Sequence, residues 1–394
     1  MIFKDKSLTY MKILIISSIP THPTTAGNCN FIKKYCTLLK QMGYDIYFLH
    51  IVYYAVTKQG RKNTEIVIEE MKKYWNDHYF VYRASLFDRF IEEIRKKYRV
   101  FRRDNYRSCD EHYLRGFHKY VNTLHRIHNF DACIINYYWF SKLFTKISIK
   151  RQAIITHDSF TYYNLRTGAK SALNLKPNEE AKALQRCPFI FAMQDEERIF
   201  FQRLAPQSKV LVSYCNYDFI ELPKVDNHNI VMLSAAFYWN INGLIWFVEK
   251  VFPLILHDYP DCRLKIGGNI NTAMLNYKSH RNIDFLGFIE DAADLYKLGD
   301  VAINPTYQGT GLKIKTFESI AYNKITMVHP HSTIGIYDRE HAPLFVSDNP
   351  NDWIAFLHKV WDNPTYADEI RAKNKNYICQ LNQFIINQFK TFLQ

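Results

Sequence analysis

The feature that most constrains the fold is the alternation of short apolar runs with helical segments, which occurs in both halves of the chain. Near the beginning, an apolar run at 12–18 is followed by a loop, by a segment at 31–43 with apolar residues at helical spacing, and by a second apolar run at 44–53. Strand, loop, helix and strand in this order form a βαβ unit, whose strands are parallel. The sequence therefore predicts the α/β fold class with doubly wound parallel sheets.

The domain organisation follows from where this alternation stops and restarts. A chain of 394 residues is long enough for two domains. A polar stretch with a proline at 221–229 precedes a new βαβ series, so we expect Rossmann-like domains at 11–222 and 223–370 that face each other across a cleft. Residues 57–123 are charged and aromatic and predict a basic helical insertion, and residues 1–10 are expected to be a dispensable leader.

Charge and cysteine usage narrow the partners and the compartment. Lys and Arg outnumber Asp and Glu by 51 to 38, which gives a formal net charge of +13 and favours an anionic partner: a nucleotide, a membrane surface or a nucleic acid. The eight cysteines form no C-x-x-C pair, as is typical of a reducing compartment, so we expect a cytoplasmic protein. The apolar run from Met11 is compatible with a signal peptide, but the helix that follows and the lack of an A-x-A cleavage site favour a buried strand.

One junction between a strand and a helix, QGTGLKIKTFE at 308–318, combines glycines, lysines and an acid. A glycine loop that opens a helix presents unpaired backbone N–H groups and the positive end of the helix dipole, which suits a phosphate. Lys313 and Lys315 add positive charge there, and Glu318, beyond the first helical turn, is placed to accept hydrogen bonds from a ribose. The junction predicts a nucleotide site; the alternative is an ordinary turn with surface lysines.

The runs around this junction, at 235–268 and 283–328, resemble the C-terminal half of GT-B glycosyltransferases, specifically the retaining family 4 within glycosyl transferases group 1. The start of the chain, at 11–49, is similar to that group's first strand, glycine loop and helix. The resemblance implies a GT-B fold that binds a nucleotide-sugar. It also implies that the segment 371–394 is a helix packing back on the N-terminal domain.

Three residues are assigned to catalysis. Glu318 matches the family glutamate that holds the donor ribose, and His157 matches the histidine that follows an N-domain strand and faces the transferred sugar. For this histidine, a core or capping role beside Asp158 is the alternative. Lys313, together with Lys315, is inferred to neutralise the leaving diphosphate. The donor-binding set is Gly27, Asn28, Phe288, Gly309, Thr310, Gly311, Leu312 and Lys315.

The chain departs from the family pattern in two places. Many members carry a second acid eight residues before the ribose glutamate, and here that region holds Gln308 but no acid. The usual Arg/Lys pair near the start of the C-terminal domain is also missing, and Trp239, Asn240 and Asn242 stand there instead. Whether these departures alter activity stays open at this point.

These observations predict a retaining, metal-independent hexosyltransferase that needs no cofactor. The expected donor is a UDP- or GDP-sugar, and the expected acceptor is a glycan or a lipid-linked saccharide in surface polysaccharide synthesis. The chain contains no D-x-D motif, with which many transferases bind a metal, and its histidines and cysteines complete no ligand set, so no metal is expected. A GT-B-like nucleotide-sugar epimerase and a non-catalytic nucleotide-sugar binding module are the alternatives.

The basic insertion bears on location. Its clustered arginines and lysines, interleaved with aromatic residues, fit an anionic membrane surface, which would place the protein at the inner face of the cell membrane as a peripheral protein. A solvated basic face is the alternative. No nucleic-acid binding module is recognisable, so no nucleic-acid partner is expected.

Overall fold

The computed structural model describes residues 11–24, 27–53, 55, 57–168, 173–225 and 227–394, so the leader predicted at 1–10 lies outside the described residues. The chain divides into two compact units. Unit 1 comprises Met1–Asn216 with Ile385–Gln394, and unit 2 comprises Tyr217–Phe384. The boundary falls before the expected one at 222/223 because the backbone of Tyr217 is held by hydrogen bonds with the side chain of Asn382, inside unit 2.

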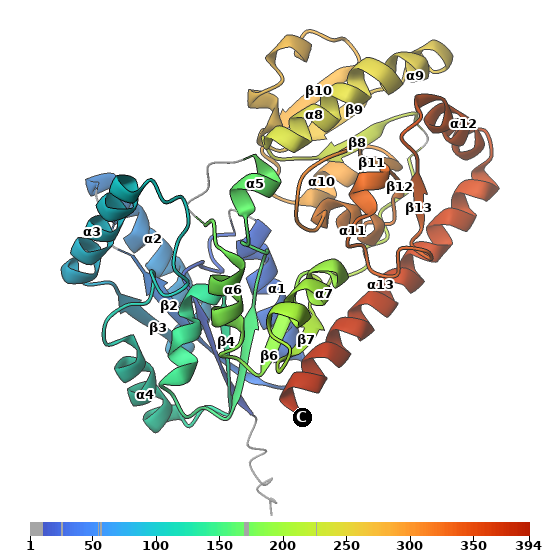
Figure 1. Ribbon diagram of the computed structural model, residues 1–394. Helices are drawn as coiled ribbons and strands as arrows, with labels where there is room; N and C mark the ends of the chain where they lie inside the picture. Colours follow the sequence, from blue (N-terminus) through green and yellow to red (C-terminus); the bar gives the residue numbers. More distant parts are fainter. Residues whose placement is uncertain (1–10, 25–26, 54, 56, 169–172, 226) are drawn as a thin grey trace, which may run out of the picture. The chain divides into compact units, whose positions relative to one another are not determined.

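Unit 1 is built on a seven-stranded sheet with the order β3-β2-β1-β4-β5-β6-β7, in which all neighbouring strands are parallel (Figure 1). Its strands are β1 (Lys12–Ser17), β2 (Asp45–Val52), β3 (Tyr79–Arg83), β4 (Ala132–Asn136), β5 (Arg151–Ile155), β6 (Phe189–Ala192) and β7 (Lys209–Val212). The central strands β1 and β4 are continuous apolar runs with almost every side chain buried, as expected for a parallel sheet covered on both faces.

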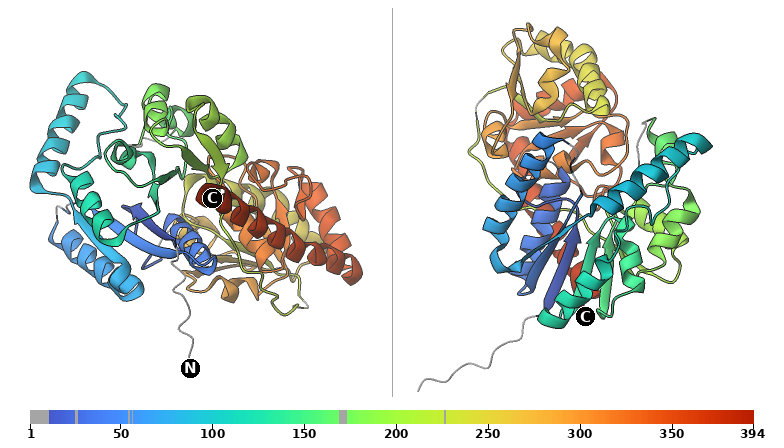
Figure 2. Two further views of the ribbon diagram at one scale, coloured as in Figure 1. Left: turned by 90° about the horizontal axis from the view of Figure 1, so that it is seen from below. Right: turned by 90° about the vertical axis from the view of Figure 1, so that its left-hand side faces the viewer.

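Helices cover this sheet on both sides (Figure 2). They are α1 (Gly27–Gln41), α2 (Lys58–Trp75), α3 (Leu86–Arg102), α4 (Phe117–His128), α5 (Tyr163–Thr167), α6 (Pro177–Leu184) and α7 (Asp195–Leu204), with 3-10 turns η1 (Asn76–His78) and η2 (Tyr138–Thr145). The last helix of the chain, α13 (Pro364–Leu393), ends in unit 1, where Phe389 and Phe392 pack on Phe191 of β6. This helix begins before residue 371, where the C-terminal segment was expected to start.

The stretch 57–123 is not purely helical, which corrects the prediction of a helical insertion. It holds α2, α3 and the start of α4, but it also holds β3, which pairs with β2 at the edge of the sheet. The strand was missed because its sequence, YFVYR, has no alternation of apolar and polar residues and its side chains are only half-buried. Helix α2 is therefore an ordinary crossover between two strands, and the segment added to the fold is reduced to α3 and the loop after it.

Unit 2 repeats the architecture with a six-stranded parallel sheet of order β10-β9-β8-β11-β12-β13. Its strands are β8 (Ile230–Leu233), β9 (Leu264–Gly267), β10 (Ile283–Gly287), β11 (Val301–Asn304), β12 (Ile325–Val328) and β13 (Leu344–Val346). Its helices are α8 (Tyr238–Trp246), α9 (Phe252–Asp258), α10 (Ala292–Tyr296), α11 (Ile314–Ala321), α12 (Pro350–Trp361) and most of α13. Short helical turns are η3 (Phe247–Val251), η4 (Asn269–Thr272), η5 (Leu275–Tyr277) and η6 (Pro330–Thr333).

The predicted fold class is confirmed: both units are parallel α/β sheets with helices. In each sheet the strand order reverses once, between β1 and β4 in unit 1 and between β8 and β11 in unit 2. Ligands of open α/β sheets bind beyond the carboxyl ends of the strands at this reversal. The two switch points are therefore the places to look for a site.

Candidate active site

The glycine loop lies at the switch point of unit 2. It follows β11 and ends at α11, as the sequence predicted for the stretch around 301–328. Gly309 has a φ of +108°, and a Cβ atom there would lie 2.8 Å from the indole ring of Trp239, so only glycine fits without moving that ring. Gly311 also has a positive φ, +75°, but a Cβ atom there would meet nothing within 4 Å. The ring nitrogen Nε2 of His331 lies 2.9 Å from the carbonyl oxygen of Gly309 and braces the loop.

The two predicted lysines are both held at this loop. Lys313 donates from Nζ to the carbonyl oxygens of Thr310 (3.2 Å) and Gly311 (3.3 Å). Lys315 donates from Nζ to Asn240 Oδ1 (3.0 Å) and to Ser234 Oγ (3.3 Å), just after β8. Burial, reinforced by the charge of Lys313, lowers the pKa of Lys315 to about 7.

Asn240 explains part of the departure from the family pattern. It stands in the region where the family has its Arg/Lys pair, and it fixes the ammonium group of Lys315 rather than supplying a charge of its own. Its amide Nδ2 also donates to the carbonyl oxygen of Ala235, so the orientation of Oδ1 toward Lys315 is determined. The ammonium group of Lys315, on α11, is therefore held in place by Asn240 of α8.

Glu318 lies one turn into α11, half-buried against two tyrosines. Its carboxylate adds to the effect of burial in raising the pKa of Tyr296 on α10, and it likewise raises the pKa of Tyr322. These contacts hold the carboxylate in place. Phe288, which follows the edge strand β10, is 84% exposed, and its packing on a nucleotide base stays a prediction.

In unit 1, His157 lies at the carboxyl end of β5 in the left-handed region, with a φ of +64°. Its Nε2 lies 2.8 Å from Asn136 Oδ1, at the end of β4. The Nδ2 of Asn136 donates to the carbonyl oxygen of Ile16, which can only accept, so Oδ1 is the acceptor and His157 Nε2 carries the proton. Burial lowers the pKa of His157 to about 3. The imidazole is thus neutral, and its Nδ1 is a hydrogen-bond acceptor.

A stack of rings joins His157 to the first helix. The ring of Tyr137 lies 4.2 Å from that of His157 and is nearly parallel to it, with an angle of 19° between the planes. The hydroxyl of Tyr137 accepts a hydrogen bond of 3.1 Å from Asn28 Nδ2. The structure therefore brings together Gly27 and Asn28 at the start of α1 and His157 after β5, three residues that the sequence placed in one site.

The loop after His157 is fixed by a buried acid. Glu180 on α6 accepts hydrogen bonds from the backbone N–H groups of Phe160 (2.9 Å) and Thr161 (2.8 Å). Nearby, Glu197 in the first turn of α7 is buried, and this burial, with the negative charge of Asp158, raises its pKa to about 8. Glu197 is therefore largely protonated at neutral pH and adds no full negative charge beside His157.

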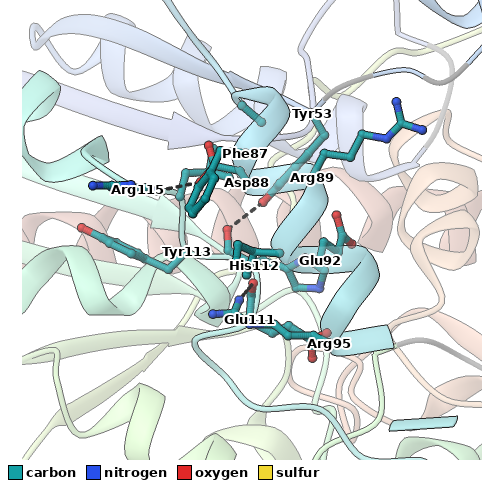
Figure 3. A pocket seen from close by; sticks show the side chains of 13 residues that line it. Tyr53, Phe87, Asp88, Arg89, Glu92, Arg95, Glu111, His112, Tyr113 and Arg115 are labelled. Atoms are coloured by element: carbon teal, nitrogen blue, oxygen red, sulfur yellow. Dashed lines mark hydrogen bonds between the residues drawn. The ribbon is translucent and has the colours of Figure 1, made fainter. Parts of the chain in front are cut away.

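A cavity of about 320 Å³ opens on the same sheet edge of unit 1, between α3 and the loop after it (Figure 3). Its lining comprises Tyr53, Ala84, Phe87, Asp88, Arg89, Ile91, Glu92, Arg95, Glu111, His112, Tyr113, Leu114 and Arg115. Aromatic contacts connect it to His157, because Tyr137 stacks on Trp139, whose ring centroid lies 5.9 Å from that of His112. The cavity presents both charge signs and several aromatic rings.

Sequence reasoning missed several of these residues. Asn136 ends β4 and Tyr137 follows it, but no local sequence pattern shows that they orient His157. His331 is one of the histidines that complete no metal-ligand set in the sequence, and the structure shows that it braces the glycine loop. Within the described ranges, no group of three or more His, Cys, Asp or Glu residues is placed to hold a metal ion.

Comparison with known proteins identifies the second unit. Residues 227–363 match the family described as glycosyl transferases group 1, which covers most of unit 2. The second unit is a glycosyl transferases group 1 domain. A curated relative, an uncharacterized 44.6 kDa protein in the cps region of Klebsiella pneumoniae, is 28% identical over 109 residues, which is 25% of this chain. The match spans only 28% of that relative's length.

Solved structures extend the likeness to both units. Sucrose-phosphate synthase from Thermosynechococcus elongatus superposes with a TM-score of 0.65 at 13% identity, over 97% of this chain and 98% of that one. Anabaena HepE in complex with UDP gives 0.59 at 11% identity, over 97% and 100%. A mutant of TarM from S. aureus, solved with UDP and alpha-GlcNAc-glycerol, gives 0.62 at 10% identity, over 98% and 100%. These likenesses show that the chain has the GT-B fold, as predicted.

Proposed function

We propose that the protein transfers a hexose from an NDP-sugar to a saccharide or lipid-linked saccharide, with retention of configuration and without a metal. The observation that carries the proposal is the lysine-flanked glycine loop at the switch point of the glycosyl transferases group 1 domain, with Glu318 one helical turn beyond it. Loop N–H groups and lysines suit a diphosphate, and a carboxylate suits a ribose diol.

The chemistry asks for charge compensation on the leaving diphosphate. In the proposal, Lys313 and Lys315 supply that compensation, since the chain lacks the family's Arg/Lys pair. A diphosphate beside Lys315 stabilises its ammonium form, so a group whose pKa is about 7 in the free protein becomes fully charged when the donor binds. The departing phosphate oxygen then takes the proton of the acceptor hydroxyl, and no enzymic nucleophile is needed.

In this proposal, unit 1 contacts the transferred sugar and binds the acceptor. His157, neutral and with Nδ1 as an acceptor, can take a hydrogen bond from a hydroxyl of the transferred sugar. The cavity beneath α3 is proposed for the acceptor, because its aromatic rings can pack on sugar rings and its charged side chains can bind hydroxyl or phosphate groups (Figure 3).

The comparisons support the choice of substrates. HepE and the TarM mutant were solved with UDP, and the latter also with alpha-GlcNAc-glycerol, which favours a UDP-sugar over a GDP-sugar and a saccharide acceptor. The curated relative comes from a cps region, which fits synthesis of a surface polysaccharide. In this proposal the protein is cytoplasmic and works at the inner face of the membrane.

The first experiment is a calorimetric titration of the full chain with UDP, GDP, ADP and CMP. We expect one nucleotide to bind at micromolar concentration and Glu318→Ala to weaken it at least about tenfold, because a charged acceptor contributes about 1.5–3 kcal/mol per hydrogen bond. Glu369→Ala, an exposed acid on α13, is the matched control and should bind like the wild type. No binding of any nucleotide, or equal binding by Glu318→Ala, contradicts the proposed donor site.

A second assay separates transfer from the alternatives. The matching NDP-sugar is incubated with and without saccharide acceptors, and products are identified by mass spectrometry and NMR. Acceptor-dependent release of the nucleotide supports transfer. A changed sugar stereocentre without acceptor would indicate an epimerase, and binding with no turnover of any kind would indicate a binding module.

A further inference from the structure

Helix α3 exposes several large apolar side chains and turns several charged side chains toward the rest of unit 1. It is 17 residues long, none of its residues is buried, and it lies on the outside of unit 1 (Figures 1 and 2). A surface helix normally turns its apolar stripe to the core and its charges to water. In α3 several charged side chains contact the rest of unit 1, whereas several large apolar side chains face outward.

The inward face is held by charged and polar contacts. Asp88 Oδ1 accepts a hydrogen bond of 3.0 Å from the backbone N–H of Arg115. Arg95 donates to the carbonyl oxygen of Glu111 (2.8 Å), and Arg99 forms an ion pair with the Glu111 carboxylate. Figure 3 shows this side of the helix, with Asp88 and Arg95 turned toward the cavity. The orientation of α3 is therefore fixed by specific partners.

The outward face is a continuous apolar stripe. It consists of Phe90, Ile94, Tyr98 and Phe101, whose spacing places them on one side of a helix and whose side chains are 47% to 83% exposed. Phe87, at the start of the helix, lines the cavity instead. Other large exposed apolar residues of unit 1, such as Ile127 and Ile199, stand singly. Single exposed apolar residues are common on proteins, whereas a contiguous stripe marks an interaction surface.

Cations border this stripe. With about 3.6 residues per turn, Lys97 lies next to the Phe90 edge and Arg102 next to the Tyr98 edge. Lys96 and Arg103 are exposed as well, but the same spacing places Lys96 on the side of the helix opposite the stripe. Within the described part of the chain, the side chains of these four residues form no ion pair. They remain available to an anionic partner.

We propose that α3 docks the protein on an anionic lipid bilayer, with the stripe of Phe90, Ile94, Tyr98 and Phe101 inserted at the headgroup boundary and the bordering cations Lys97 and Arg102 facing anionic headgroups. Apolar burial and electrostatic attraction are the two contributions on which interfacial helices depend. A second copy of the chain fits less well, because a symmetric interface would set the cationic borders of two helices against each other. In the described residues, no helix is long and apolar enough to cross a membrane.

This inference does not depend on the proposed sugar transfer, because it concerns only whether unit 1 binds lipid. If the protein is a glycosyltransferase, docking through α3 brings the cavity on the other side of that helix to a lipid-linked acceptor. Vesicle binding and nucleotide binding can therefore fail separately.

The test is co-sedimentation of the full chain with unilamellar vesicles of phosphatidylcholine alone or mixed with phosphatidylglycerol. We expect binding to the mixed vesicles that weakens as salt is raised, and little binding to phosphatidylcholine alone. Lys97→Gln with Arg102→Gln should weaken partitioning roughly 25-fold, at about fivefold per charge. Phe90→Ser with Phe101→Ser should weaken it at least about tenfold, since two aromatic side chains lose their burial.

Matched controls keep the result specific. Ile127→Ser with Ile199→Ser removes two exposed apolar residues elsewhere on unit 1, and Lys150→Gln with Lys209→Gln removes two exposed cations; both should bind vesicles like the wild type. Circular dichroism and nucleotide titration check that every variant is folded. Absence of vesicle binding, equal losses in the control variants, or lipid-independent dimerisation abolished by the phenylalanine variant would overturn the proposal.

Discussion

The two switch points occupy equivalent places in the two sheets but are built from different groups, backbone in unit 2 and side chains in unit 1. In unit 2 the site is a backbone loop braced by two lysines, one histidine and an indole ring. In unit 1 the corresponding place is filled by side chains from two strand ends, those of β4 and β5, and from the start of α1, held by one asparagine amide and a stack of aromatic rings. A backbone loop suits a constant group such as a diphosphate, whereas dispersed side chains suit a group that differs between enzymes.

The two switch points also differ in the charge state of their titratable side chains. Lys315 has a pKa of about 7 and can gain a charge when a diphosphate arrives. His157, with a pKa of about 3, and Glu197, with a pKa of about 8, are both largely uncharged at neutral pH. In the proposed function, unit 2 therefore binds an anion and unit 1 contacts hydroxyl groups. Four predictions test this contrast.

The largest expected effect separates catalysis from donor binding. His157→Ala should lower the transfer rate by about 10²-fold or more, the cost of removing a positioned polar group at a reacting centre. Its UDP affinity should stay within twofold of the wild type, because the diphosphate and ribose contacts are proposed for unit 2. Initial rates and calorimetry on the same preparation measure both quantities.

The control for this change is His341→Ala, an exposed histidine in unit 2 that should alter neither quantity. If His157→Ala weakened UDP binding as much as it slowed transfer, the division of labour between the two units would be wrong.

The contrast between a contiguous loop and dispersed side chains also explains how much of each site could be predicted from the sequence. In unit 2, glycines, lysines and the acid are contiguous, so one stretch predicted the loop, the helix and the residues that the structure brings together. In unit 1, Asn136 and Tyr137 lie about twenty residues before His157 in the chain, and their contacts depend on the order of β4 and β5 in the sheet. No local spacing encodes such a pairing.

The edge of the fold was also harder to predict than its centre. Buried strands such as β1 are continuous apolar runs, but β3 is half-buried and reads as part of a helical region. Likewise, charge clustering indicated that the segment around α3 is basic, but only the structure shows that Asp88 and Arg95 turn inward while Lys97 and Arg102 stay exposed.

The second prediction compares two glycines of one loop. Gly309→Ala should weaken UDP binding about tenfold or more, because its Cβ would press on the indole of Trp239 at 2.8 Å and displace the loop. Gly311→Ala meets no neighbour and should cost only the strain of a positive φ, about 1–2 kcal/mol of stability, with a smaller loss of affinity. Equal affinities for the two variants would show that the loop backbone does not bind the diphosphate.

The third prediction concerns the pH dependence of stability in unit 1. The native pKa of His157 is lowered to about 3 from 6.5, so the unfolded chain binds a proton that the native chain does not, and stability falls as pH drops from 6.5 toward 3. His157→Asn should remove up to about 1.4 kcal/mol of this slope per pH unit. Urea unfolding of the wild type and the variant at several pH values between about 4 and 7, which covers most of this pH range, measures the difference in slope.

The comparison for this variant is His341, whose pKa is raised by its hydrogen bond with Asp338. For His341 the pH dependence has the opposite sign: the stability that its hydrogen bond contributes is present at low pH and is lost as pH rises through the native pKa. His341→Asn should therefore not reduce the acid-side slope. If it did so as strongly as His157→Asn, the slope would not report the buried imidazole of the unit 1 site.

The smallest effect, and the most specific for unit 2, is proton uptake when UDP binds. In the free protein only part of the Lys315 population is protonated near pH 7.5, about half a unit above its pKa, and a bound diphosphate should complete that protonation. Calorimetry in buffers of different ionisation enthalpy should therefore show uptake of a fraction of a proton. Lys315→Arg should bind UDP without this uptake, because the guanidinium is already charged. Equal uptake by Lys315→Arg would place the titrating group elsewhere and remove the electrostatic contrast between the two switch points.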